Sequence, residues 1–132
     1  MDRLFLDANV LVSAALKPRS RIADLWRLPG VRLLGSPHVV TEARRNVRDS
    51  KAAERLEALL ATITILPAEP SDFAIADDPD LPSRDRPILL AAIVCRSDYL
   101  LTGDMKHFAP CFGRIAEGVR VVLPGEYLRT HA

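Results

Sequence analysis

Leu4-Phe5-Leu6-Asp7-Ala8-Asn9-Val10-Leu11-Val12-Ser13-Ala14 is the stretch of sequence from which the fold can be worked out. Three apolar residues are followed at once by Asp7, and an apolar pattern with small residues begins after it. This order predicts a buried strand that ends at a carboxylate and turns into a helix, capped by Asn9 and running to about Leu16. In an open α/β sheet, ligands bind outside the carboxyl ends of the strands, so Asp7 is a candidate site residue.

A second strand ends in the same way late in the chain. Tyr99-Leu100-Leu101-Thr102 is followed by Gly103 and Asp104. A carboxylate directly after a buried strand costs desolvation free energy unless a partner offsets its charge. A functional role is therefore the favoured explanation for both Asp7 and Asp104.

The rest of the chain predicts strands that alternate with helices. Further strands are expected at residues 31–34, 63–66 and 119–123, and helices at residues 21–28, 37–47, 51–61, 86–96 and 124–128, with Ser20 and Ser36 as N-cap candidates. Residues 67–83, which are rich in proline and aspartate, predict a loop, and residues 105–112 a short helix or turn. Short apolar strands joined by helices are typical of a parallel sheet covered on both faces. The predicted fold class is α/β, with three layers in the order α/β/α.

Composition bounds the class of protein. With 132 residues, of which 48% are hydrophobic, the chain is expected to form one domain over residues 1–132. The formal net charge of +1 argues against a broad polycationic surface, so nucleic-acid binding would depend on a local patch. The longest apolar run, Ile88 to Cys95, is too short to span a membrane and no signal-peptide pattern follows Met1, so a cytoplasmic protein is expected. Cys95 and Cys111 lack a C-x-x-C spacing and are expected to be reduced thiols.

Two further carboxylates occupy positions that need an explanation. Glu42 lies at the edge of the apolar stripe of the helix that Ser36-Pro37 begins, and Asp85 precedes the most apolar helix. If Asp7, Asp104 and these two acids converge, they repel one another, and a divalent cation would offset that repulsion.

The predicted ligands favour a hard cation. Oxygen-only ligands, with no Cys or His at a matching spacing, suit Mg²⁺ or Mn²⁺ rather than zinc. His38 and His107 are expected to be surface or cap residues. A cation held by carboxylates, with open water positions, can generate hydroxide and stabilise the oxygens of an in-line phosphoryl displacement. Phosphoryl chemistry is therefore the predicted use of the four acids.

Some of these residues have a structural alternative. Asp85 can serve only as the N-cap residue of the helix after it, and Glu42 can be a solvated helix acid. Arg44, Arg45 and Arg48 can form an ordinary solvated helix face, or they can hold phosphates beside the acidic site. The residues alone leave these alternatives open.

Four segments, taken in order, resemble the successive motifs of PIN domains. They are Leu6–Ala14, Ser36-Pro37 with Glu42, Asp85–Ala92, and Tyr99–Asp104 with Phe108. From about Asp2 to Leu128 the chain is similar to bacterial and archaeal PIN proteins classed as toxin components of toxin–antitoxin pairs. The resemblance implies a Mg²⁺- or Mn²⁺-dependent ribonuclease with a parallel-sheet α/β/α fold, commonly a dimer, with a cognate antitoxin as partner.

The resemblance also implies roles for individual residues. The acidic cluster that holds the metal consists of Asp7, Glu42, Asp85 and Asp104, with Asn9 and Thr102 as supporting polar groups. The candidate RNA-binding residues are Arg44, Arg45, Arg48 and Lys106. Lys106 is also a departure from the family pattern, because many of these toxins carry another acid at its place. The loop acids Asp77, Asp78 and Asp80 are candidates to substitute for that acid.

Rival classes fit the sequence less well. A haloacid-dehalogenase-type phosphatase needs a second acid where this chain has Asn9. A phospho-accepting receiver domain needs adjacent acids after the first strand and a phospho-acceptor after the third strand, where this chain has Pro67. The stronger alternative is a PIN-fold protein that binds RNA or a partner protein without cleaving it.

A homodimer is expected from apolar residues outside the strands. Ile22, Leu25 and Trp26, with the terminal helical turn, offer more apolar surface than so short a chain is expected to bury alone. An antitoxin could cover the same surface.

Overall fold

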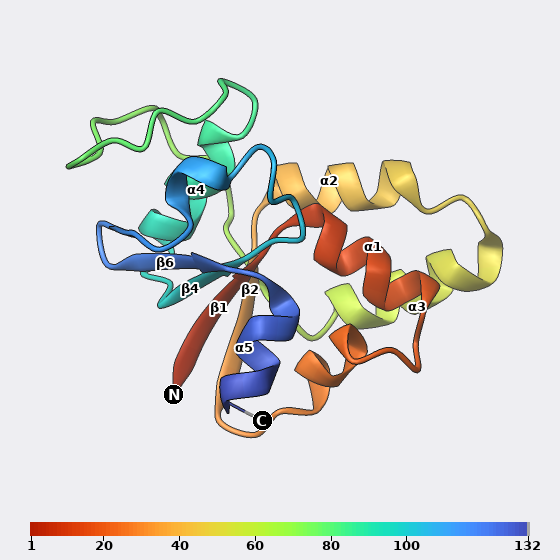
Figure 1. The fold of residues 1–132 in the computed structure, drawn as a ribbon. Helices are drawn as coiled ribbons and strands as arrows, with labels where there is room; N and C mark the ends of the chain where they lie inside the picture. The colour runs from red at the N-terminus through yellow and green to blue at the C-terminus, as the bar shows by residue number, and fades with distance from the viewer. Residues whose placement is uncertain (132) are drawn as a thin grey trace.

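The computed structural model describes residues 1–131, which form a central six-stranded sheet between helices (Figure 1). In order across the sheet, the strands are β3 (Thr64–Ile65), β2 (Val31–Gly35), β1 (Asp2–Leu6), β4 (Tyr99–Leu101), β6 (Val119–Val122) and β5 (Ile115–Ala116). All neighbouring pairs are parallel except β5 and β6, which are antiparallel. The predicted α/β class with a parallel sheet is confirmed. The strand order also differs from the 2-1-3-4-5 order of the flavodoxin-like folds that include receiver domains.

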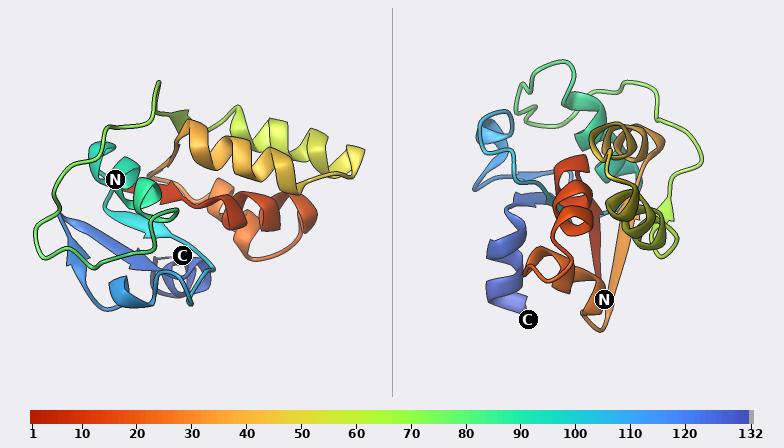
Figure 2. Two further views of the ribbon diagram at one scale, coloured as in Figure 1. Left: turned by 90° about the horizontal axis from the view of Figure 1, so that it is seen from above. Right: turned by 90° about the vertical axis from the view of Figure 1, so that its right-hand side faces the viewer.

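The helices form the two outer layers. They are α1 (Ala8–Leu16), α2 (Pro37–Asn46), α3 (Ser50–Leu60), α4 (Arg86–Val94) and α5 (Pro124–His131), with short 3₁₀ segments η1 (Ile22–Arg27) and η2 (Ala109–Cys111). Helix α1 packs against both α2 and α3, and Figure 2 shows these three helices side by side on one side of the molecule. Within residues 1–131 no helix combines the length and the apolar character needed to cross a membrane.

Burial of the central strands explains their apolar sequence. Strand β1 lies between β2 and β4, and its residues Leu4, Phe5 and Leu6 have no exposed surface. Leu100 and Leu101 of β4 are equally buried. A parallel strand that is covered on both faces needs apolar side chains on both faces. The apolar sequences of β1 and β4 are therefore continuous instead of alternating with polar residues.

Helix α2 forms as its sequence predicts and carries Glu42 to the edge of the core. The Ser36 hydroxyl accepts the N–H of Val39 at 3.5 Å, and Pro37 occupies the first turn. Val39 and Ala43 are fully buried. Glu42 lies beside this buried stripe and keeps part of its side chain in solvent.

Two predicted N-caps are wrong. Helix α1 is capped by Asp7, whose carboxylate accepts the N–H of Ala8 at 2.8 Å, so Asn9 lies inside the first turn. Ser20 caps no helix, because its hydroxyl donates to the carbonyl of Lys17 at 2.7 Å. The segment after it forms the 3₁₀ element η1 instead of a full α-helix.

The two edges of the sheet differ from the prediction. Strand β3 is reduced to two exposed residues at one edge. The other edge is β5, which the sequence analysis did not predict. Glu117 and Gly118 join β5 to β6 with φ values of 49° and 84°, the left-handed backbone of a two-residue hairpin turn.

The apolar residues that suggested a homodimer are largely used inside the chain. Leu25 is fully buried, and Ile22 and Trp26 pack partly buried against the core. The Trp26 indole donates to the carbonyl of Leu59 at 3.3 Å. Leu128 of α5 is only 2% exposed, so these residues give little support to a dimer surface.

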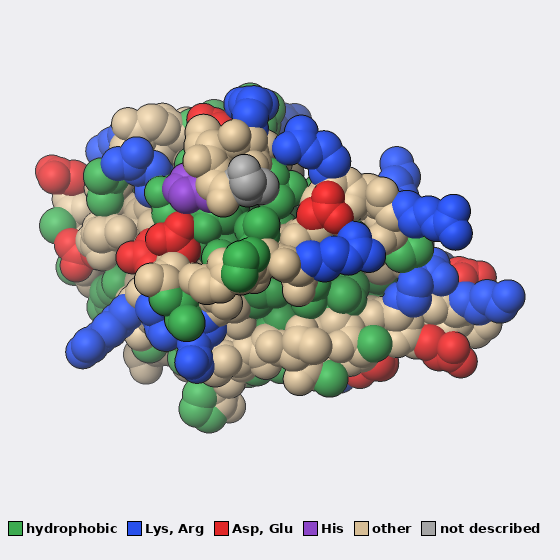
Figure 3. Space-filling model, turned by 90° about the horizontal axis from the view of Figure 1, so that it is seen from below, with side chains coloured by type: hydrophobic (Ala, Val, Ile, Leu, Met, Phe, Trp, Pro, Cys, Tyr) green, Lys and Arg blue, Asp and Glu red, His purple; other side chains and the backbone are tan. Residues whose placement is uncertain are grey.

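Charged side chains are mixed on the face seen from below (Figure 3). Hydrophobic side chains lie over its middle, and Lys and Arg side chains surround them together with Asp and Glu. This distribution agrees with the net charge of +1, which argued against a broad polycationic surface.

Tyr127 ties the two ends of the chain together. Its hydroxyl donates to Oδ2 of Asp2 at 2.6 Å, and its ring stacks on His131 with a centroid distance of 4.1 Å. Burial, and then the hydrogen bond to Asp2, raise the pKa of Tyr127. This contact anchors α5 to the start of β1.

Replacing Tyr127 by Phe is expected to lower the free energy of unfolding by about 1.5 kcal/mol, because a hydrogen bond to a charged group is lost. Urea unfolding measures the change. Tyr99→Phe is the matched control, since the Tyr99 hydroxyl is exposed and, among the residues that the structure describes, forms a polar contact only with Nε2 of His131, at 3.3 Å. Equal losses in the two variants would contradict the anchoring role of Tyr127.

Candidate functional site

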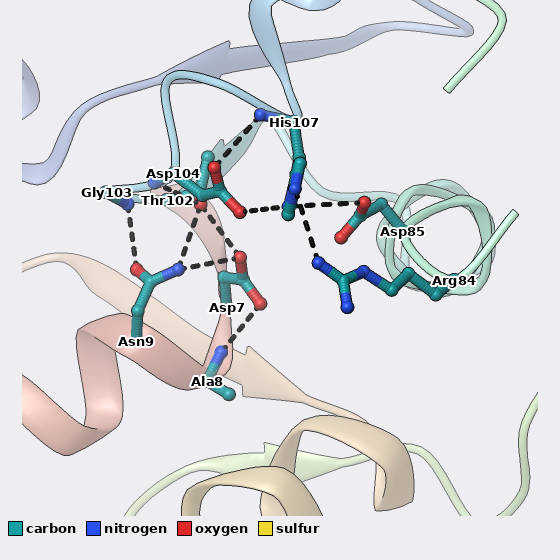
Figure 4. Close-up of polar contacts among 9 residues, drawn as sticks. All are labelled: Asp7, Ala8, Asn9, Arg84, Asp85, Thr102, Gly103, Asp104 and His107. Atoms are coloured by element: carbon teal, nitrogen blue, oxygen red, sulfur yellow. Dashed lines mark hydrogen bonds and ion pairs between the residues drawn. The ribbon is translucent and has the colours of Figure 1, made fainter. Parts of the chain in front are cut away.

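The site lies where β1 and β4 end side by side. Leu6 is paired with Leu101 in the sheet, so the residues that follow, Asp7 and Thr102, are neighbours. The N–H of Asp7 continues the ladder to the carbonyl of Leu101 at 3.0 Å, and the Thr102 hydroxyl donates to Oδ2 of Asp7 at 2.8 Å. The parallel register therefore brings these two strand ends into contact (Figure 4).

The carboxylate of Asp7 is buried and accepts three hydrogen bonds. Oδ1 accepts the N–H of Ala8, and Oδ2 accepts the Asn9 amide at 3.0 Å as well as the Thr102 hydroxyl. Asp7 is only 5% exposed. Burial raises the pKa of Asp7, and the charge of Asp85 acts in the same direction, while the hydrogen bonds lower it.

Asn9 connects helix α1 to the loop after β4. Its Oδ1 accepts the N–H of Gly103 at 2.8 Å, while its Nδ2 donates to Asp7 and, at 3.3 Å, to Thr102. A Cβ atom on Gly103 would lie 3.3 Å from that Oδ1, so the close approach favours glycine. The loop is thereby held with Asp104 facing Asp7.

Asp104 and His107 form a compact turn after β4. Asp104 Oδ1 accepts the backbone N–H of His107 at 3.0 Å, and Oδ2 lies 2.7 Å from Nδ1 of the same residue. The backbone N–H of Asp104 donates to the Thr102 hydroxyl at 3.0 Å. Asp104 is thus fixed at both its backbone and its side chain.

Asp85 enters the site from the opposite side, just before α4 (Figure 4). It is 7% exposed, and its side chain caps no N–H of the helix. Its Oδ2 is buried and has no hydrogen-bond partner among the described residues. Nδ1 of His107 lies 3.6 Å from this oxygen. The N-cap alternative for Asp85 therefore does not explain its position.

The predicted acids line one pocket. Its volume is about 610 Å³, and the acids on its wall are Asp7, Glu42, Asp85 and Asp104. Glu42 is the most solvated of them, with 45% of its side chain exposed and Nη1 of Arg45 at 3.6 Å. The structure thus brings together residues that lie up to 97 positions apart in the sequence.

The predicted RNA-binding residues lie outside this wall. Arg44 is held by both oxygens of Glu57, at 2.9 and 2.8 Å, and does not line the pocket. Arg48 and Lys106 are exposed residues and do not line it either. Arg84, which the sequence analysis did not single out, does line the pocket.

The loop acids do not substitute for a missing ligand. Asp78 forms an ion pair with Arg86 at 2.7 Å, and its other oxygen accepts the N–H of Asp80 at 2.9 Å. Neither of these acids, nor Asp77, lines the pocket. That expectation is wrong, because the loop turns these side chains toward solvent and Arg86.

His107 was expected to be a surface or cap residue, but its ring lies beside Asp104 and Asp85. Asp85, Asp104 and His107 offer ligand atoms that all lie within 4.8 Å of one another. In the sequence, His107 lies three residues after Asp104, and a single tight turn can bring two residues at that spacing together. This spacing is the signal that could have placed His107 beside the acids. His38 also lines the pocket.

The residues present fit a divalent cation. Carboxylate oxygens and an imidazole nitrogen are ordinary ligands of such ions. Oδ2 of Asp85, which has no hydrogen-bond partner among the described residues, belongs to a residue of the group formed with Asp104 and His107. Within residues 1–131, Asp7, Asp85 and Asp104 form no ion pair with a Lys or Arg. Their charge is therefore left for another cation to offset.

The fold and the acidic pocket define an α/β protein with a candidate metal site at the carboxyl edge of its sheet. Over residues 3–106 the sequence matches the PIN domain family, and the chain belongs to that family. No curated protein matches the sequence.

Two solved structures share the fold. One is described as VapBC2 from Rickettsia felis bound to a DNA fragment from their promoter, with a TM-score of 0.64, 17% identity, and coverage of 92% of this chain and 98% of that chain. The other is described as VapBC-1 from nontypeable Haemophilus influenzae, with a TM-score of 0.60, 17% identity, and coverage of 93% and 98%. At this identity the likeness supports the α/β/α fold.

The raised pKa of Asp7 predicts how stability depends on pH. Native Asp7 binds a proton more readily than unfolded Asp7, whose pKa is about 3.8, so its contribution to stability falls as pH rises through the native pKa. In Asp7→Asn this contribution is absent. The unfolding free energy of the metal-free wild type minus that of the variant should therefore decrease with rising pH, as urea unfolding at several pH values measures.

The loss of matched hydrogen bonds in Asp7→Asn adds an offset that does not depend on pH, so the slope is the informative quantity. A difference that increases with pH would show that the hydrogen bonds outweigh burial and that the native pKa is lowered.

Proposed function

We propose that this PIN-domain protein is a metal-dependent endoribonuclease that hydrolyses RNA phosphodiester bonds, and that it is the toxin of a toxin–antitoxin pair. The observation that carries the proposal is the buried, unpartnered Oδ2 of Asp85, which shares a pocket with Asp7 and Asp104. Membership of the PIN domain family supports the same assignment.

The proposed metal ligands are Asp7, Asp85 and Asp104, with Glu42 at the rim of the pocket. Oxygen ligands of this kind suit Mg²⁺ or Mn²⁺. Such an ion, when bound, lowers the pKa of a water ligand and offsets charge on the phosphoryl oxygens. Asn9 and Thr102 act as supporting groups, because they hold the Asp7 carboxylate in one orientation.

In this proposal, RNA approaches the pocket where basic residues can contact its phosphates. Arg84 lies on the pocket wall, and Arg45 lies beside Glu42 at the end of α2. Arg48 and Lys106 are exposed, and they lie close in sequence to Arg45 and Asp104, respectively. They complete the proposed set of phosphate contacts. Arg44 is the weakest member of the predicted set, because Glu57 already holds its guanidinium group.

The proposed partners are a cognate antitoxin and a second copy of the chain. The toxin assignment and the homodimer both rest on the resemblance of the sequence motifs, and the fold shared with VapBC2 and VapBC-1 is consistent with an antitoxin partner. A cytoplasmic location belongs to the same proposal.

One experiment separates this proposal from a PIN-fold module that binds RNA or protein without cleaving it. Purified protein is incubated with mixed RNAs in Mg²⁺, in Mn²⁺ and with a chelator. Cleavage that requires the metal and stops with the chelator supports the nuclease, whereas binding without cleavage in every condition supports the non-cleaving module.

Asp85→Asn is expected to lower RNA cleavage by about 100-fold or more while the protein stays folded. Asn serves an N-cap almost as well as Asp, and Asp85 caps nothing in this structure, so a purely structural role predicts no loss. Asp80→Asn makes the same chemical change on an exposed loop residue and should keep the wild-type rate. Wild-type cleavage by Asp85→Asn would remove Asp85 from the metal site.

Replacing Arg45 and Arg48 together by Gln is expected to weaken RNA binding and to flatten its salt dependence. Each lost phosphate contact reduces the slope of log K against log salt by about 0.7 for single-stranded RNA. Fluorescence anisotropy in the presence of chelator measures the slope. Arg44→Gln is the control, and an unchanged slope in the double variant would show that these arginines are a solvated helix face.

A further inference from the structure

The imidazole of His107 occupies the space between the two carboxylates on opposite sides of the pocket. Its Nδ1 lies 2.7 Å from Oδ2 of Asp104 and 3.6 Å from Oδ2 of Asp85. These are the two oxygens that a cation at this place would bind, and the one on Asp85 has no hydrogen-bond partner within residues 1–131. Figure 4 shows the ring pointing into the gap between them.

The backbone of His107 is fixed independently of its ring. The N–H of His107 donates to Oδ1 of Asp104, which leaves Oδ2 of Asp104 directed at the ring. The side chain is 29% exposed, so part of the ring is open to solvent. A nitrogen donor is therefore held at the acidic pocket by the same turn that positions Asp104.

The hydrogen bonds define the tautomer of the metal-free ring. Nη2 of Arg84 lies 3.3 Å from Nε2 of His107, and a guanidinium group has donors only, so Nε2 is the acceptor. The ring proton is then on Nδ1 and is donated to Asp104. A metal ion bound to Nδ1 would therefore take the place of this proton.

We propose that His107 is a direct ligand of the divalent cation through Nδ1, together with Asp85 and Asp104, and that it makes the site select Mn²⁺ over Mg²⁺. The inference rests on the proposed function, because it concerns the same metal site. Imidazole nitrogen is a poor ligand for Mg²⁺ and a good one for transition-metal ions, whereas carboxylates accept both.

The distances are compatible with ligation. Nδ1 lies 2.7 Å from Oδ2 of Asp104 and 3.6 Å from Oδ2 of Asp85. Asp85, Asp104 and His107 offer ligand atoms that all lie within 4.8 Å of one another, so one cation would be within reach of all three residues.

Ligation by the neutral ring of His107 requires no net gain or loss of a proton. With a cation held at Nδ1, the neutral ring would carry its one proton on Nε2. Nε2 would then no longer accept from Arg84, and the guanidinium group would be free of His107. Arg84, which lies on the pocket wall, would be available to a phosphate group.

Pulsed electron paramagnetic resonance of the Mn²⁺-loaded protein tests the assignment directly. A coordinated imidazole gives a ¹⁴N coupling to the bound Mn²⁺. The coupling is expected in the wild type, lost in His107→Gln and kept in His38→Gln, which changes another histidine of the same pocket. Bound Mn²⁺ without nitrogen coupling in the wild type overturns the proposal, and this measurement needs no variant to fold.

Metal affinities give the second readout. By calorimetric titration, His107→Gln should raise the Kd for Mn²⁺ by about tenfold or more and change that for Mg²⁺ much less. Equal changes for the two ions, or no change, overturn the selectivity role of His107 and leave the nuclease proposal intact. Failure of the wild type to bind either ion contradicts the proposed function itself.

Discussion

The buried carboxylate of Asp7 is the constraint on which the site depends. Three donors converge on it: the backbone N–H of Ala8, the side-chain amide of Asn9, and the hydroxyl of Thr102, which follows β4. Because they hold a charge in a buried position, they also fix the ends of β1 and β4 relative to each other. The core below supplies the rigidity, since the last residues of both strands, Leu6 and Leu101, are fully buried.

Much of the fold was predictable because burial on both faces leaves a plain signal. The central strands are short apolar runs, and α2 begins with Ser36 and Pro37 at the expected place. The edges were harder to predict. Strand β3 has only two exposed residues, and β5 depends on a turn at Glu117 and Gly118 whose left-handed backbone the sequence signals weakly. Edge strands bury too little surface to require a continuous run of apolar residues.

The site was predictable to the extent that strand register positions it. Asp7 and Asp104 follow paired strands, so their proximity is a consequence of parallel topology. Asp85 was ambiguous, because a helix start explains an Asp equally well until the absence of a capping bond is seen. His107 and Arg84 were missed, because loop conformations place them and no periodicity reports where a loop side chain points.

Other acids in the same chain show what a structural carboxylate looks like here. Arg86 pairs with Asp72 at 2.8 Å and also with Asp78, and hydrogen bonding to Asp80 and Arg86 lowers the pKa of Asp78. With 18 Lys and Arg against 17 Asp and Glu, the chain has cations enough to pair its acids. Asp7 in the pocket is instead held by neutral donors, which orient its carboxylate without cancelling its charge. Burial of acids that have no cationic partner is unfavourable for folding, and a cation bound from solution would offset that cost.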